Sequence, residues 1–241
     1  MSGGWNESAQ AWIAAVGDRG DWAREHVIDP AMLGRIEKRG FRSALDVGCG
    51  EGRFCRLLRQ RGIDAIGIDP TPALIEEARR RDASGRYLIG KAERLAFDDQ
   101  KFDLVVSCLT LIDIADFRAA IREMARVLKI GGSLLIANLT SFTSACAAEG
   151  WIRDERGRGV HYPVDRYLEE FPQWVAWGGI RIENWHRPLD AYMTALLEEG
   201  LVLRFFQEPE PTSADAERVA LYRRAPWFVV MEWTKPASTI G

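Results

Sequence analysis

The sequence has few of the residues that build disulfide frameworks or zinc sites, and it has no apolar run long enough to span a membrane. Its four cysteines, Cys49, Cys55, Cys108 and Cys146, show no Cys-x-x-Cys spacing. This disfavours zinc binding and disulfides, and favours a reducing cytoplasm. The first ten residues, MSGGWNESAQ, lack the basic and apolar regions of a secretory signal. We therefore expect a cytoplasmic protein with no metal site and no membrane partner.

An excess of positive charge is also missing. The 241 residues include 32 Lys and Arg against 35 Asp and Glu, a formal net charge of −3. That balance provides no general attraction for a nucleic-acid backbone, so no nucleic-acid partner is expected. The short basic run Arg79–Arg81 is interpreted as the solvated end of a helix, because cations suit helix C-termini.

Residues 42–139 alternate between short apolar strands and amphipathic helices. Strands are predicted at SALDVG, DAIGID, GRYLIG, FDLVVSCL and SLLIANL, and helices at GRFCRLLRQRG, TPALIEEARRRD and ADFRAAIREMARVLKIGG, the last ending at Gly131 and Gly132. Strands and helices at this spacing form right-handed βαβ crossovers. The pattern predicts the α/β class, with a doubly wound, mostly parallel sheet.

Three further segments flank this core within one predicted domain. Residues 1–41 are expected to form a helical lid, and residues 140–186 an insertion of turns and short helices without a clear period. Residues 187–236 resume as a helix and two strands, which completes a seven-stranded sheet whose C-terminal strand is antiparallel.

The stretch LDVGCGEG follows the first strand and carries three glycines at alternate positions, Gly48, Gly50 and Gly52. A dinucleotide turn has G-x-G-x-x-G spacing, but Arg53 stands where its third small residue is needed. No Gly-Lys-Ser/Thr follows, which excludes a P-loop. Asp46 would repel a pyrophosphate and attract an ammonium or sulfonium. Asp69, about 20 residues further on, stands where an acid accepts hydrogen bonds from ribose hydroxyls. The two acids favour a nucleoside joined to an amino acid.

Together, LDVGCGEG, IGIDPTPALIEEAR, GKAERLAFDDQKFDLVVSC and LKIGGSLLIAN resemble the ordered motifs of class I S-adenosylmethionine-dependent methyltransferases of the small-molecule type. The resemblance covers residues 42–138 and, more loosely, residues 185–235. It implies that S-adenosylmethionine is the cofactor and S-adenosylhomocysteine the product. The residues implied to bind the cofactor are Asp46, Gly48, Cys49 and Gly50 at its methionine end, Asp69 and Pro70 at the ribose and adenine, Lys91, Ala92 and Glu93 along the adenine edge, and Cys108 and Leu109 beside the methyl group. Lys91 departs from the family, because many members have an acid at this position that accepts a hydrogen bond from the adenine amino group. Lysine can only donate hydrogen bonds and cannot replace that acid.

Candidates for a catalytic base are few, because the chain has three histidines. His161 and His186 belong to the segments expected to cover the site, and both are candidates beside the alternative that they are structural. The third histidine, His26, can equally be a residue on the solvent-facing side of a helix. Arg187 either binds a substrate carboxylate or caps backbone carbonyls, and the second is favoured.

The acceptor is expected to be a small aromatic or apolar molecule, methylated at O, N or C by in-line displacement. The two variable segments contain seven tryptophans, which either line the acceptor site or pack these segments onto the core: Trp5, Trp12, Trp22, Trp151, Trp174, Trp177 and Trp185. The alternatives are an RNA or protein methyltransferase and a non-catalytic S-adenosylmethionine-binding protein. Either a monomer or a homodimer is compatible with the sequence.

Overall fold

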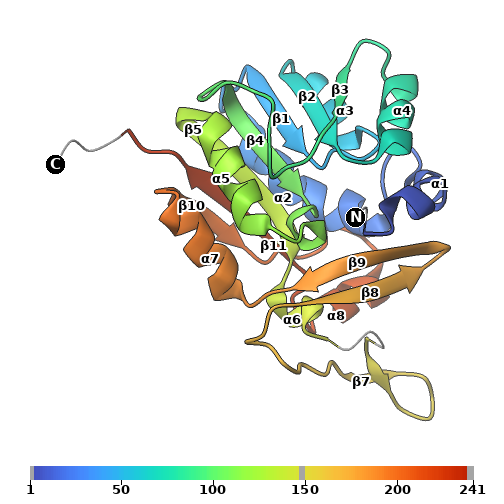
Figure 1. The fold of residues 1–241 in the computed structure, drawn as a ribbon. Coiled ribbons are helices and arrows are strands. Elements are labelled where there is room, and N and C mark those ends of the chain that lie inside the picture. The colour runs from blue at the N-terminus through green and yellow to red at the C-terminus, as the bar shows by residue number, and fades with distance from the viewer. Residues whose placement is uncertain (1–2, 147–149, 238–241) are drawn as a thin grey trace.

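A seven-stranded sheet in the order β10-β11-β5-β4-β1-β2-β3 forms the centre of the molecule (Figure 1). The computed structural model describes residues 3–146 and 150–237. The strands are β1 (Ser43–Val47), β2 (Asp64–Asp69), β3 (Arg86–Ile89), β4 (Phe102–Cys108), β5 (Leu128–Leu139), β10 (Val202–Gln207) and β11 (Phe228–Thr234). β11 runs antiparallel to β5 and β10, and the other neighbours are parallel. The predicted α/β fold is confirmed.

Helices cover both faces of this sheet. On one face lie α5 (Phe117–Val127) and α7 (Leu189–Glu198), and on the other lie the π-helix η1 (Arg24–Ile28), α2 (Asp29–Ile36), α3 (Arg53–Arg59) and α4 (Pro72–Arg81). Successive strand residues point to opposite faces. In β1, Leu45 and Val47 therefore pack into the layer of α5 and α7, while Ala44 packs with α2 and α3.

One helix boundary near the sheet and one additional helix differ from the prediction. The helix α5 ends at Val127 rather than at the glycine pair, because Leu128 is already extended and pairs with Phe102 of β4. A short helix, α8 (Ala216–Tyr222), interrupts the connection between β10 and β11 and was not predicted. Apart from the 3₁₀ turn after β4, the remaining strands and helices of the core and C-terminal segments were predicted in their observed order.

The insertion is built largely of β-hairpins, so the expectation of turns and short helices was wrong. Its one described α-helix is α6 (Ser141–Ser144). Two hairpins follow, formed by β6 (Ile152–Arg153) with β7 (Gly159–His161) and by β8 (Phe171–Trp177) with β9 (Ile180–His186). In β9 every second residue is buried, but Asn184 and His186 are among them. Polar residues on the inward face concealed the period of two that identifies a strand.

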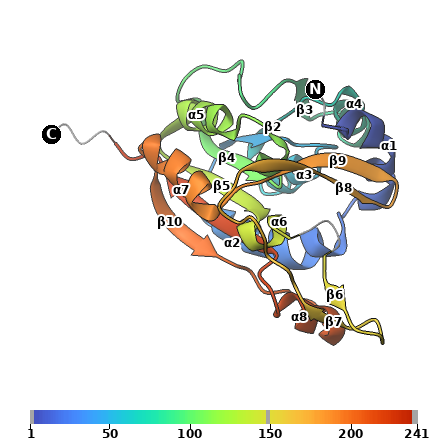
Figure 2. The same ribbon diagram turned by 60° about the horizontal axis from the view of Figure 1, so that its bottom comes forward.

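The β6–β7 hairpin projects away from the sheet and meets α8 (Figure 2). Arg224, just after α8, donates hydrogen bonds to the carbonyl oxygens of Gly159 and Val160 at 2.6 and 2.8 Å. Segments far apart in the chain therefore support each other at this end. Among residues 3–146 and 150–237, no helix has the length and apolar character that crossing a membrane requires.

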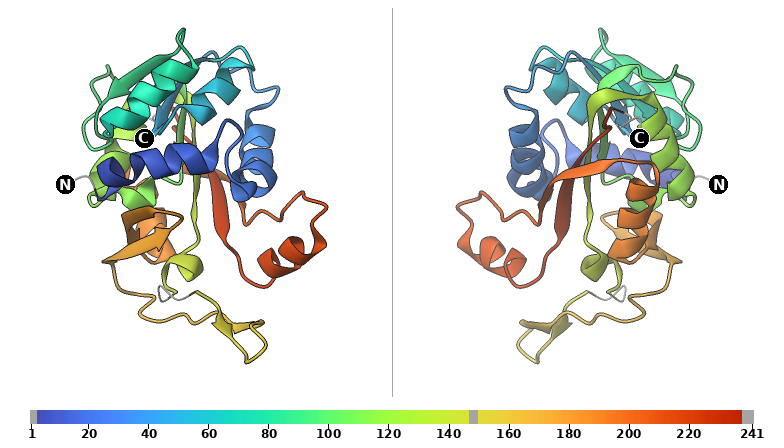
Figure 3. Two further views of the ribbon diagram at one scale, coloured as in Figure 1. Left: turned by 90° about the vertical axis from the view of Figure 1, so that its right-hand side faces the viewer. Right: turned by 90° about the vertical axis from the view of Figure 1, so that its left-hand side faces the viewer.

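The N-terminal segment is helical, as predicted, and its first helix α1 (Trp5–Val16) lies between the core and the β8–β9 hairpin (Figure 3). The backbone N–H of Glu183 donates to the carbonyl oxygen of Gly3 at 2.8 Å. The Ser8 hydroxyl donates to the Arg181 carbonyl at 3.0 Å and accepts from its N–H at 2.9 Å. These bonds fasten α1 to β9, and the pair is called the roof below.

Candidate active site

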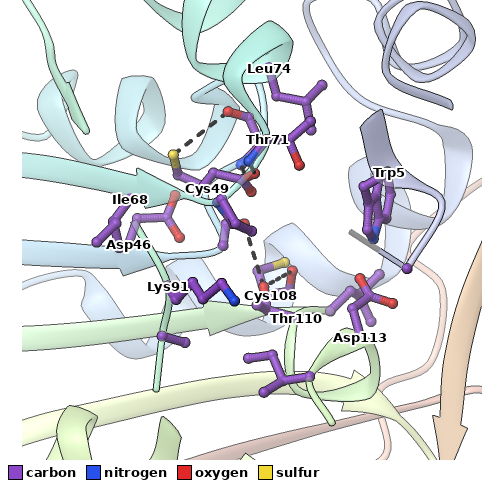
Figure 4. A pocket seen from close by; sticks show the side chains of 18 of the residues that line it. Trp5, Asp46, Cys49, Ile68, Thr71, Leu74, Lys91, Cys108, Thr110 and Asp113 are labelled. Carbon is purple, nitrogen blue, oxygen red and sulfur yellow. Dashed lines mark hydrogen bonds between the residues drawn. The ribbon is translucent and has the colours of Figure 1, made fainter. Parts of the chain in front are cut away.

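A cavity of about 520 Å³ lies at the carboxyl ends of β1, β2 and β4, under the roof (Figure 4). This is the edge at which open α/β sheets bind ligands, and the volume suits a small-molecule site. The walls come from the turn after β1, the end of β2 and the loops after β3 and β4. Trp5 and Trp12 of α1 and Trp185 of β9 complete the enclosure.

The glycine turn holds the backbone of β1 close to the neighbouring strands. Gly48 has φ of 76°, and a Cβ atom there would lie 2.2 Å from Cγ2 of Thr110, so no other residue fits. The N–H groups of Gly48 and Cys49 donate to the carbonyl oxygen of Ile68 at 2.8 and 3.0 Å. The turn therefore crosses the end of β2 and brings the first two walls of the cavity together.

Asp69 is fixed by this turn. Its carboxylate accepts from the N–H of Gly50 at 3.0 Å and from the N–H of Thr71 at 2.8 Å. Burial raises the pKa of Asp69, and these two hydrogen bonds oppose that shift. Each carboxylate oxygen has a second lone pair, so the side chain can accept two more hydrogen bonds from a ligand in the cavity. That capacity fits the adjacent hydroxyls of a ribose.

Asp46 is more deeply buried, with 1% of its surface exposed. The thiol of Cys55 donates to its Oδ2 over 3.4 Å. Burial raises the pKa of Asp46 to about 7, because little in the site compensates its negative charge. A cationic group bound beside it would restore the charged form. The ammonium and sulfonium of S-adenosylmethionine have the required sign, so this donor set fits that ligand.

Arg53, which stands at the position that argued against a dinucleotide turn, takes an unexpected part in the site. Gly52 makes the close helix–strand approach instead, since a Cβ atom there would lie 2.6 Å from the ring of Tyr87. The buried Arg53 guanidinium pairs with both carboxylate oxygens of Asp29 at 2.5 and 2.9 Å. This ion pair anchors α2 against α3. The partners lie 24 positions apart, and no local pattern indicated the pair.

The loops after β3 and β4 form the rest of the floor. Burial raises the pKa of the Cys108 thiol to about 12, so this sulfur stays protonated at neutral pH. Leu109 has φ of 56°, a conformation costly for a branched side chain. Such strain is common where a backbone is shaped around a ligand.

The eleven residues predicted to contact the cofactor all line this one cavity: Asp46, Gly48, Cys49, Gly50, Asp69, Pro70, Lys91, Ala92, Glu93, Cys108 and Leu109. Lys91 is exposed at the edge, and Figure 4 shows its side chain reaching toward Cys108 and Thr110. Their convergence supports the assignment, and cofactor contact by each residue stays a prediction.

The two histidines predicted as bases lie elsewhere. His161 is exposed on β7, outside the residues that line the cavity. His186 is fully buried, and its ring nitrogens lie 2.8 Å from the Ser144 hydroxyl and 2.9 Å from the Tyr167 carbonyl oxygen. Burial lowers the pKa of His186, so the ring is neutral and fixed. The structural alternative therefore describes His186 better, and His161 lies away from the cavity.

Arg187 acts as predicted, since its buried guanidinium donates to the carbonyl oxygens of Leu111, Ile114 and Ala115 at 3.1, 2.6 and 3.0 Å. Those carbonyls belong to the loop after β4, which contains the 3₁₀ turn η2 (Leu111–Asp113). Arg187 thus holds the shape of one cavity wall from behind.

Sequence reasoning missed two acids that meet the roof. Glu51 accepts from the indole N–H of Trp12 at 2.9 Å. Asp113 accepts from the side chains of Trp5 and Asn184, and burial raises its pKa to about 8. Asp113 could have been noticed in the sequence, because it lies in the loop that follows the fourth strand, at the carboxyl edge of the sheet. The sequence could not show that Trp12 meets Glu51 or that Trp5 meets Asp113, because each pair joins distant segments of the chain.

Comparisons with known proteins agree with this site. Residues 45–136 match a family model described as a methyltransferase domain. The chain is 35% identical over 123 residues to a malonyl-[acyl-carrier protein] O-methyltransferase of Salmonella typhimurium, which is 51% of this chain and 46% of that protein. It is 27% identical over 170 residues to a ubiquinone biosynthesis O-methyltransferase of Coxiella burnetii, covering 65% of this chain and 72% of that one.

Among solved structures, an S-adenosylmethionine-dependent methyltransferase from Mesorhizobium loti superposes with a TM-score of 0.74 at 27% identity, covering 88% of this chain and 97% of that one. The chain spans about half the length of the malonyl-[acyl-carrier protein] relative. The family match, the superposition and the fit of the cavity to the cofactor agree. Residues 45–136 therefore form a methyltransferase domain of the class I, S-adenosylmethionine-dependent type, and these findings support S-adenosylmethionine as the cofactor.

Proposed function

We propose that this protein transfers the methyl group of S-adenosylmethionine to an oxygen atom of a small, aromatic or apolar acceptor. The observation that carries the proposal is the continuity of one cavity. Its floor contains the acids and glycines of the cofactor end, and its roof contains Trp5, Trp12 and Trp185. A cofactor and a flat acceptor can therefore meet in one enclosed space.

The floor residues bind and orient. In this proposal Asp46 faces the cationic methionine end, Asp69 accepts from the ribose hydroxyls, and Lys91, Ala92 and Glu93 follow the adenine edge. When bound, S-adenosylmethionine supplies an already activated methyl group, so the chain needs chiefly to align the acceptor and exclude water. Cys108 and Leu109 border the space where that alignment takes place.

The roof selects the acceptor. Small-molecule sites are lined by aromatic and apolar groups with a few polar ones, and the indoles of Trp5 and Trp185 meet that description. Both curated relatives named above are O-methyltransferases, which supports oxygen over nitrogen or carbon as the accepting atom. Their two acceptors differ, so neither name is transferred to this chain.

The charge around the cavity argues against a polyanion such as RNA. Six acids line it, Asp46, Glu51, Asp69, Glu93, Asp113 and Glu183, against three bases, Arg24, Arg53 and Lys91. Two of those bases are already paired, Arg24 with Asp21 and Arg53 with Asp29. An acidic surface repels phosphates. A small neutral acceptor avoids that cost.

Cytoplasmic location and assembly as a monomer or homodimer remain part of this proposal. All four cysteines are free thiols, which suits a reducing compartment. Gel filtration with light scattering measures the assembly directly.

Two measurements test the function. Calorimetry with S-adenosylhomocysteine should show binding, and the ligand should raise the melting temperature, as any ligand of the native state does. Incubation with methyl-labelled S-adenosylmethionine and a metabolite extract should then give a labelled small molecule whose methyl group is on oxygen. Label on RNA or protein would favour those acceptors instead. Binding without any transferred label would favour a non-catalytic cofactor-binding protein, and absence of binding would refute the assignment.

A further inference from the structure

Asp113 differs from the other cavity acids in what holds it. Asp69 is fixed by backbone N–H groups of the floor, and Asp46 by a thiol of α3. Asp113 belongs to η2 at the end of the floor, but its hydrogen-bond donors belong to the roof. The Trp5 side chain donates from α1 and the Asn184 amide from β9. Figure 4 shows Trp5 and Asp113 side by side at one end of the cavity.

The carboxylate is half-buried and lines the cavity, so a ligand can reach it. Trp5 and Trp185, proposed above as acceptor walls, line the same cavity. The Trp5 and Asn184 donors satisfy only part of its capacity, since an ionised carboxylate accepts about four hydrogen bonds. A hydroxyl held between the tryptophans can therefore donate to Asp113.

The charges that face Asp113 come from several elements. From the floor, Asp69 raises its pKa and Arg24 of η1 lowers it. Asp46, Glu51, Lys91, Glu93 and Arg53 line the same cavity from the floor, and Glu183 lines it from β9. Arg187 stands behind η2, paired with carbonyl oxygens. Burial outweighs the other influences and brings the pKa to about 8, near the pH at which a general base works best.

Resting on the proposed function, we propose that Asp113 is the proton acceptor for a neutral hydroxyl-bearing acceptor. The acceptor's O–H proton passes to the Asp113 carboxylate as its oxygen bonds to the methyl carbon. The sulfur–methyl bond breaks, and its electron pair stays on sulfur. One positive sulfonium and one negative carboxylate thus become a neutral thioether and a neutral carboxylic acid, so charge and atoms balance.

This pairing of charges favours the reaction in an enclosed cavity. Before transfer, the sulfonium stabilises the ionised carboxylate, and after transfer neither group is charged. An anionic carboxylate would be a poor acceptor, because Asp113 would repel it and could take no proton from it. Trp5 and Asn184 act as positioning residues, since they hold the carboxylate but do not accept the proton.

An infrared titration tests the proposal without an identified acceptor. The full-length protein is titrated with bound S-adenosylhomocysteine and with bound sinefungin, an unreactive analogue that carries an ammonium in place of the sulfonium. The protonated-carboxyl band of Asp113 should titrate at least about 1 pH unit lower with sinefungin, a tenfold change in proton affinity. Asp113→Asn should lack this band. A band that titrates at the same pH in both complexes, or one that persists in Asp113→Asn, would overturn the proposal.

Rates with the acceptor fraction of the metabolite extract give a second readout. Asp113→Asn should lower the rate of label transfer by about 10²- to 10⁴-fold, the usual contribution of a general base, with S-adenosylhomocysteine affinity changed less than about threefold. Trp5→Phe removes a hydrogen-bond donor that lowers the pKa of Asp113. In this variant the rate should therefore begin to rise at a higher pH than in the wild type. A rate for Asp113→Asn that is a tenth of the wild-type rate or more would refute the role of Asp113. If the wild-type protein does not bind S-adenosylhomocysteine, the proposed function itself is refuted.

Discussion

Replacing Asp46 by asparagine is expected to stabilise the ligand-free protein, although it removes a residue proposed to bind the cofactor. The carboxylate is 1% exposed, and burial raises its pKa from 3.8 to about 7. Between these two values the native protein holds a proton that the unfolded chain has released. Because the native state binds more protons there, the free energy of unfolding falls as the pH rises from about 4 to 7.

The size of the effect follows from the difference between the two pKa values. A difference of about 3 pH units corresponds to about 4 kcal/mol, lost from the wild-type protein once the pH exceeds 7. Asparagine has nearly the same shape and no charge to bury. The free energy of unfolding of Asp46→Asn minus that of the wild type should therefore be near zero at pH 4. This difference should rise between pH 4 and pH 7 and reach a plateau of up to about 4 kcal/mol at higher pH.

Urea unfolding followed by tryptophan fluorescence, at intervals from pH 4 to pH 9, measures this difference. Asp98→Asn, at an exposed acid in the loop before β4, is the matched control and should show no such trend. With saturating S-adenosylhomocysteine the order should reverse, because the variant binds the ligand more weakly. A stability difference that stays constant across the pH range would refute the argument that burial of Asp46 costs the native state free energy.

Three further substitutions separate binding from folding. Asp69→Ala should weaken S-adenosylhomocysteine binding by about 10- to 100-fold in calorimetry, since it removes charged hydrogen bonds to the ribose; unchanged affinity would mean that the ribose binds elsewhere. Gly48→Ala forces a Cβ atom against Thr110 at a positive φ, and should cost about 2 to 5 kcal/mol in urea unfolding. Arg187→Met leaves three buried carbonyl oxygens without their donor and should cost about 3 kcal/mol; an unchanged unfolding midpoint would show that η2 keeps its shape without it.

The part of the cavity proposed to hold the cofactor could be predicted, because the local sequence determines its shape. Gly48, Asp46 and Asp69 each stand at the carboxyl end of a strand, and parallel strands bring those ends to one edge. Order along the chain therefore implies neighbourhood in space. The position of Arg53 illustrates the limit of this reasoning, because its spacing argued correctly against a dinucleotide turn but did not reveal its buried partner.

The part proposed to hold the acceptor could not be predicted, because it depends on contacts between distant segments. Ser8 pairs with Arg181, 173 positions away, and Asn184 reaches Asp113 across 71. The β8–β9 hairpin was missed for a related reason. Asn184 and His186 face inward, where Asn184 bonds to Asp113 and His186 to Ser144, and such polar residues do not follow an apolar period. Of these two inward polar residues, only Asn184 reaches an acid of the cavity, whereas His186 is held by Ser144 and Tyr167.

This division between floor and roof couples the two halves of the site. Asp113 belongs to the floor by its position in the chain, but its donors Trp5 and Asn184 are placed only when α1 and β9 lie over the cavity. The roof therefore both encloses the cavity and completes the hydrogen bonding of this carboxylate. Changes in the roof can alter which acceptor fits without disturbing β1, which carries Asp46, or the turn that binds Asp69. Because the donors of Asp113 are in the roof, such changes also alter its pKa, so acceptor choice and pH dependence should vary together in this protein.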